Sequence, residues 1–127
     1  MTSRVSFERW KSDFGPILES LMATLNLSRR SIKQGPAALL SSSDQLIAAA
    51  RGASIWASAH RRPVADLDAR LERLIRSYRA LGELMAYEAR SPIGPDRRAL
   101  AREMGGLVDV FSQLVVILSD GASVESE

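Results

Sequence analysis

Few residues in this chain have the type and spacing that catalysis requires. His60 is the only histidine, so a His-rich metal site cannot form. The run Ser41–Asp44 could supply a nucleophile only beside a general base, and the sequence places none near it. Asp66, Asp68 and Glu72 fit the solvated start of a helix, where carboxylates complement the dipole, better than an acid–base pair. We therefore expect no catalytic site.

The absence of cysteine excludes several further kinds of functional site. No disulfide, thiolate nucleophile or cysteine-bound zinc or iron–sulfur site can form. The chain also lacks a glycine-rich phosphate loop, a Gly-x-Ser-x-Gly turn and the Glu-x-x-His pair of di-iron bundles. These exclusions predict a non-enzymatic protein with no metal and no cofactor.

Arginine is the remaining residue type that could bind a ligand. The net charge is +2, and all but two of the basic residues are arginine, whose guanidinium group pairs well with phosphate. Two basic sets are Arg29, Arg30 and Lys33, and Arg61 and Arg62. They define an alternative function, a nucleic-acid-associated module such as a small ribonucleoprotein subunit. In an antiparallel bundle, however, the two sets lie at opposite ends, which argues against one nucleic-acid footprint.

An amphipathic helix from Pro63 to Arg90 organises the rest of the chain. Apolar residues recur in it at three- and four-residue steps, which places them on one face. These residues are Leu67, Leu71, Leu74, Ile75, Tyr78, Leu81 and Met85. Pro63 suits a first helical position, and Ser91-Pro92 ends the run. One such helix cannot bury its own apolar face, so it requires partner helices.

The first partner is an apolar-faced segment that ends at Gly35. Its phase continues across Gly15-Pro16, so two structures fit: one helix kinked at Pro16, or a helix at 4–13 followed by another from Pro16. The unbroken phase favours the kinked helix.

A second helix opens at Pro36 and is rich in alanine and serine. Its small face predicts the closest helix pair of the bundle. That face consists of Leu39, Leu40, Ser43, Ile47, Ala50, Ser54 and Ala57. Ser42-x-x-Gln45 fits a capping box, so a restart of the helix near residue 42 is an alternative.

The last helix runs from about residue 95 to 119, and we expect 120–127 to be a disordered acidic tail. Residues 1–119 then form a single domain. Because the connections are only a few residues long, neighbouring helices must run antiparallel. We predict an all-α, up-down-up-down four-helix bundle. A three-helix core with one helix swapped into a partner chain is the competing arrangement.

Apolar residues outside the core faces are the strongest indication of function. In a lone bundle each helix exposes one side to water, so apolar residues there are candidates for contact with another chain. The candidates are Trp56, Leu84, Tyr87, Val110, Val116 and Ile117. Trp56, for example, lies on the opposite side of its helix from Ile47. The pattern predicts an interaction or adaptor protein that forms a homodimer or binds another protein.

Two further expectations concern ligands and location. A small apolar ligand between the helices, beside the alanine- and serine-rich segment, is a third possible function. The longest apolar run, Leu114–Leu118, is too short to span a membrane, and the first residues lack the apolar core of a signal peptide. We therefore expect a cytoplasmic protein with no membrane partner, and leaderless secretion is the alternative that this pattern leaves open.

Overall fold

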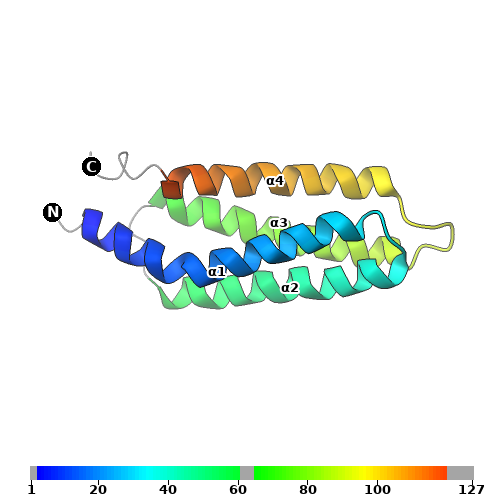
Figure 1. The fold of residues 1–127 in the computed structure, drawn as a ribbon, viewed down its shortest axis with the longest axis horizontal. Coiled ribbons are helices and arrows are strands. Elements are labelled where there is room, and N and C mark those ends of the chain that lie inside the picture. The colour runs from blue at the N-terminus through cyan, green and yellow to red at the C-terminus, as the bar shows by residue number, and fades with distance from the viewer. Residues whose placement is uncertain (1–2, 61–64, 120–127) are drawn as a thin grey trace.

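The computed structural model describes residues 3–60 and 65–119, which fold into four α-helices. The helices are α1 (Ser3–Ser31), α2 (Pro36–Ala59), α3 (Ala65–Ala89) and α4 (Arg97–Ser119). They lie side by side and alternate in direction as an up-down-up-down bundle (Figure 1). The predicted all-α four-helix fold is confirmed, and the predicted tail at 120–127 lies outside the described residues. None of the four described helices has both the length and the apolar character needed to cross a membrane.

Helix α1 is one continuous helix with Pro16 inside it, as the unbroken apolar phase predicted. Because proline has no N–H, the carbonyl of Ser12 loses its usual helical partner at this point. Figure 1 shows the axis of α1 change direction part-way along the helix. The kinked single helix is therefore the correct one of the two alternatives.

Helix α2 runs without interruption through residue 42, so the alternative of a restart there is wrong. The hydroxyl of Ser42 donates to the Oγ of Ser31 on α1, at 2.5 Å. The hydroxyl of Ser43 donates to the backbone carbonyl of Gly82 on α3, at 2.6 Å. The two serines thus join α2 to the helices on both of its sides, since a buried hydroxyl must find a partner inside the protein.

The buried face of α2 is wider than the predicted one, because α2 packs against both α1 and α3. Leu46 and Ala53 belong to this face, with exposures of 0% and 1%. Leu40, which was predicted for the core, is 36% exposed. The single apolar stripe predicted from the sequence is centred too close to the α3 side of α2. For this reason the predicted face omits Leu46 and Ala53 and includes Leu40.

Helices α2 and α3 form the most extensive pair in the bundle, as the small residues of α2 predicted. At Gly82 the backbone of α3 lies close against α2. A Cβ atom at this position would lie 2.9 Å from Cγ1 of Ile47 and 3.2 Å from the carbonyl oxygen of Ser43. Such distances are below normal van der Waals contact, so only glycine fits here without movement of α2.

The predicted apolar faces of α1, α3 and α4 form the remaining core. On α3, the predicted residues are fully buried except Ile75, which is partly buried. The hydroxyl of Tyr78 donates to the backbone carbonyl of Leu21 on α1, at 2.6 Å, and ties α3 directly to α1. Burial raises the pKa of the Tyr78 phenol above its usual value of 10, because the charged phenolate would lose its hydration.

Helix α4 begins with a polar network that also holds the end of α3. The carboxylate of Asp96 accepts the backbone N–H of Ala99 at 3.1 Å, which satisfies a free donor of the first helical turn. The N–H of Asp96 itself donates to Oε1 of Glu88 at 2.8 Å. Glu88 is buried, so this carboxylate fixes the connection between α3 and α4.

Replacing the N-cap residue of α4, Asp96, should lower the stability of the whole bundle. We expect Asp96→Ala to lower the free energy of unfolding by about 1 kcal/mol, because the Ala99 N–H loses its acceptor. Asp96→Asn should retain most of the stability, since an amide oxygen also caps. Urea unfolding followed by circular dichroism measures the change, with the exposed mid-helix Asp109→Ala as the control. Equal stability of the Asp96→Ala variant and the wild type would show that the cap contributes nothing.

Candidate functional site

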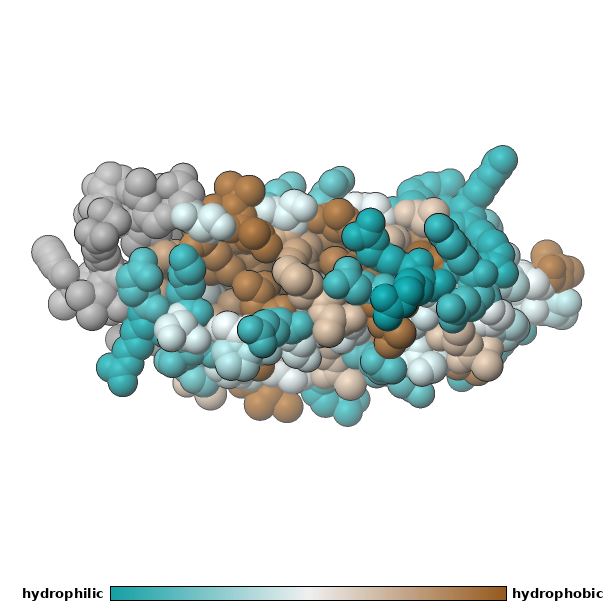
Figure 2. Space-filling model, viewed as in Figure 1, coloured by the Kyte–Doolittle hydropathy of each residue, from teal (hydrophilic) through white to brown (hydrophobic). Residues whose placement is uncertain are grey.

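The bundle is open between α1 and α4. In the described part of the chain the extensive helix pairs are α1–α2, α2–α3 and α3–α4, and no contact of similar extent joins α1 to α4. The two helices meet at one end, where the guanidinium of Arg97 donates to the backbone carbonyls of Ile32 and Gln34. Figure 2 shows apolar side chains gathered along the half of this side farther from that contact. The surface formed by Leu18, Met22, Val108, Val115 and Val116 is named the α1–α4 seam.

Contacts with α2 fix which side of α1 faces this seam. Ser31 is hydrogen bonded to α2, and Ser20 and Thr24 line a shallow depression shared with α2. By helical phase, Leu18 and Met22 lie on the other edge of α1, toward α4. Leu18 is only partly buried and Met22 is 44% exposed. The α4-facing edge of α1 is therefore apolar and accessible.

Contacts with α3 fix the orientation of α4 in the same way. Gln113 accepts a hydrogen bond from Arg70 of α3 at 3.1 Å, and Glu103 lines a depression shared with α3. Val108 and Val115 lie on the opposite edge, toward α1, and are only partly buried. Val116 lies on the outward side of α4 next to them and is 63% exposed. Both walls of the seam thus present aliphatic side chains.

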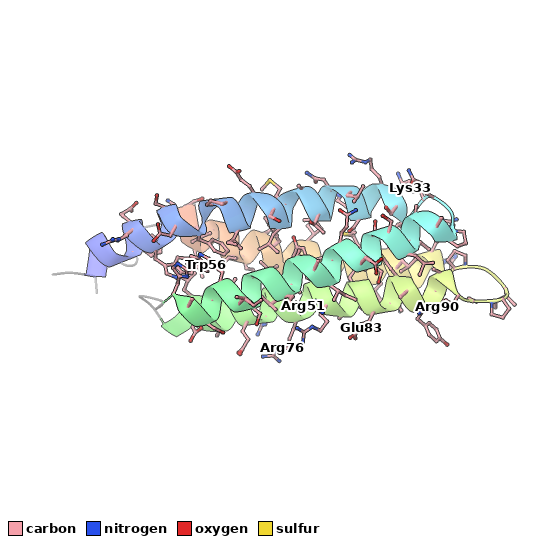
Figure 3. All side chains as sticks on the ribbon, turned by 90° about the horizontal axis from the view of Figure 1, so that it is seen from below. Lys33, Arg51, Trp56, Arg76, Glu83 and Arg90 are labelled. Carbon is pink, nitrogen blue, oxygen red and sulfur yellow. The ribbon has the colours of Figure 1, made fainter. Side chains whose placement is uncertain are left out.

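The end of the bundle where α1 and α4 meet is strongly basic. Its exposed cations are Arg29, Arg30, Lys33, Arg90, Arg97 and Arg98, which together are named the basic end. Figure 3 shows Lys33 and Arg90 at this end, on opposite sides of the bundle. No acidic residue occurs from Ser20 to Gln34. The nearby carboxylates of Glu88 and Asp96 both accept backbone N–H groups.

Only part of the predicted nucleic-acid set lies at this end. Arg29, Arg30 and Lys33 are exposed there, whereas Arg61 and Arg62 lie outside the described residues. Helix α2 ends at the other pole, near Trp56 (Figure 3), as antiparallel packing predicted. The sequence reasoning missed the arginines that α3 and α4 add. The antiparallel topology could have indicated them. It brings the ends of the first and third helices and the start of the fourth helix to the same end of the bundle.

Trp56 is partly buried and packs against α1, although the sequence placed it on an outward face. Its ring centroid lies 5.3 Å from that of Trp10 and 5.2 Å from that of Phe14, both on α1. His60 stacks on its other side, at 4.1 Å. Figure 3 shows Trp56 between α1 and α2. The prediction that Trp56 faces away from the bundle is wrong, because α1 covers the side of α2 opposite α3.

The other predicted interface residues divide into two groups. Leu84, Val110 and Ile117 are partly buried and pack against the core. Tyr87 and Val116 are 72% and 63% exposed. Tyr87 borders a shallow depression of about 430 Å³ on the outer surface of α2 and α3, far from the seam. Of the six predicted residues, Val116 is the one that is strongly exposed on α4, beside the open side of the bundle.

Three of the candidate catalytic residues, His60, Ser42 and Ser43, make hydrogen bonds that hold the helices. Nδ1 of His60 lies 2.8 Å from the carbonyl of Trp56, which can only accept, so Nδ1 carries the proton in this contact. Ser42 and Ser43 bridge helices, and Ser41 is exposed. Among residues 7–60 and 67–119, no three acidic or histidine side chains group closely enough to hold a metal ion. The seam and the basic end are thus the two notable surfaces.

No protein-family model matches this chain, and neither a curated protein nor a solved structure matches it, so the two surfaces described above are the grounds for assigning a function.

Proposed function

We propose that the chain is a non-enzymatic interaction protein of the cytoplasm, and that a second copy of the chain covers the α1–α4 seam. One observation carries the proposal: Met22 and Val116 are 44% and 63% exposed on the two helices, α1 and α4, that do not close on each other. Aliphatic side chains grouped in this way favour contact with another apolar surface, since burial removes them from water.

A second copy fits this surface better than an unrelated partner does. An isologous interface places the same patch on both sides, and an aliphatic strip is complementary to itself because it has no charge or donor pattern to match. The basic end also selects the orientation of the copies. A parallel pair would bring two clusters of cations together, whereas an antiparallel pair keeps them at opposite extremities.

Light scattering behind a sizing column tests this proposal. At micromolar concentrations the wild-type chain should have twice the protomer mass of 13.9 kDa. The double variant Met22→Glu, Val116→Glu should have the protomer mass, because both carboxylates would be buried without a partner in the dimer. Both side chains are exposed in the protomer, so circular dichroism should show an unchanged fold.

The matched control is Ile55→Glu, which places the same charge on the outer surface of α2. Ile55 is 65% exposed, as Val116 is, but lies on the helix that faces away from α4. This variant should remain dimeric. A wild-type chain that stays monomeric over the whole concentration range, or an equal loss of mass in both variants, would rule out the seam as the dimer contact.

A further inference from the structure

We propose that the basic end docks on the surface of an anionic lipid bilayer, with Ile93 inserted among the headgroups. Ile93 is 96% exposed, at the tip of the connection between α3 and α4. This connection protrudes beyond the ends of the helices in Figure 1. It is flanked by the cations of the basic end, so one exposed apolar tip and several positive charges lie at the same end of the bundle. The inference is independent of the dimer proposed above.

The turn that carries Ile93 is held in one conformation. Pro92 fixes its own φ angle, and the N–H of Gly94 donates to the carbonyl of Ser91 at 3.2 Å, which closes the turn around Ile93. Gly94 has a φ of 96°, a left-handed conformation that favours glycine. Because the exposed isoleucine is preorganised, its insertion costs little conformational entropy.

The cations of the basic end outnumber the two carboxylates nearby, those of Glu88 and Asp96. Among the residues that the structure describes, no carboxylate pairs with Arg30, Lys33, Arg90 or Arg98. Arg97 donates to the carbonyls of Ile32 and Gln34, which covers the negative end of the α1 dipole. The remaining cations are therefore available to an external polyanion.

The shape of this end favours a bilayer over a nucleic acid. The protruding turn presents an aliphatic side chain, whereas base stacking requires an aromatic one. The exposed aromatic residue nearby, Tyr87, borders a shallow depression on the side of α2 and α3 and does not lie at the tip. A fluid bilayer accepts a convex tip, and its acyl boundary provides an apolar environment for Ile93. Membrane attachment typically combines apolar insertion with a basic patch, and both are present here. The earlier expectation of no membrane partner considered only helices that span a bilayer.

Cosedimentation with vesicles tests the proposal. The wild-type chain should bind vesicles of mixed phosphatidylcholine and phosphatidylserine at low salt and should not bind pure phosphatidylcholine. Ile93→Ser should reduce the affinity about fivefold, through loss of insertion. The double variant Lys33→Gln, Arg98→Gln should reduce it more than tenfold, since each charge near an anionic surface contributes about a fivefold factor. All three side chains are exposed, and circular dichroism should show that the variants remain folded.

Ile55→Ser and Arg51→Gln are the matched controls. Both residues are exposed on α2, away from the basic end, and their replacement should leave binding within about twofold of the wild type. Fluorescence anisotropy with single- and double-stranded oligonucleotides provides the competing readout. Failure to bind anionic vesicles, binding that Ile93→Ser leaves unchanged, or tight binding to oligonucleotides alone would each overturn the proposal.

Discussion

Gly82→Ala is expected to destabilise the bundle by about 1–3 kcal/mol, although alanine is the better helix former. The added methyl group would meet Cγ1 of Ile47 at 2.9 Å, the carbonyl oxygen of Ser43 at 3.2 Å and Cβ of Leu46 at 3.3 Å. None of these atoms is the free end of a flexible side chain, so α2 itself must move. Overpacking of this kind costs about 1–3 kcal/mol, and displacement of the Ser43–Gly82 hydrogen bond adds about 1 kcal/mol. The gain in helix propensity, about 1 kcal/mol, is smaller.

Gly52→Ala provides the control with the opposite sign. Gly52 lies inside α2, and a Cβ atom there would meet nothing within 4 Å. Only the higher helix propensity of alanine then affects stability, so the free energy of unfolding of this variant should rise by up to about 1 kcal/mol. Thermal and urea unfolding of the two variants beside the wild type measure both changes. If the two substitutions shifted stability in the same direction, the close approach of α2 and α3 at Gly82 would not be a packing constraint.

The faces of α3 and α4 could be predicted from the sequence because each helix has one apolar stripe with strong periodicity. On α4, Leu100, Leu107 and Leu114 recur at seven-residue steps, and all are at most 1% exposed. Helix α2 was harder. Its alanines and serines carry little hydropathy contrast, so periodicity alone could not show that Leu46 is buried and Leu40 exposed. The position of α2 between two neighbours decides which side chains are covered.

The candidate surfaces depend on which helices pack against each other. The apolar pattern of a single helix does not indicate its neighbours. Trp56 was correctly placed opposite the α3-facing side of α2, but no pattern in the chain indicated that α1 lies there. Leu18 and Val108 are only partly buried and lie on the seam, because α1 and α4 do not pack closely. Ile93, in a loop, has no periodicity at all. Such residues become visible only when the order of helices around the bundle is known.

Tyr78→Ala is expected to cost about 3–5 kcal/mol, a large part of the stability of a domain of this size. The ring is fully buried, and its removal leaves a cavity in the core of the bundle. Tyr78→Phe should cost about 1 kcal/mol, because it removes only the hydrogen bond to the Leu21 carbonyl. Both changes are measured by urea unfolding. Tyr87→Phe, at a position 72% exposed, should be close to neutral.

The same phenol gives the bundle an alkaline sensitivity that Tyr78→Phe should remove. Burial raises the pKa of Tyr78 above 10, so above pH 10 the unfolded chain releases this proton before the folded chain does. The folded chain then holds more protons, and the free energy of unfolding falls as pH rises, by at most about 1.4 kcal/mol per pH unit. Below pH 10 the contribution of Tyr78 to the free energy of unfolding is constant.

In the Tyr87→Phe background Tyr78 is the one remaining tyrosine, so tyrosinate absorbance reports its ionisation directly. The contradicting outcome is a stability difference between the wild type and the Tyr78→Phe variant that is the same below and above pH 10. In that case the phenol would not be desolvated. The contact between α3 and α1 would then be far weaker than the hydrogen bond to the Leu21 carbonyl implies.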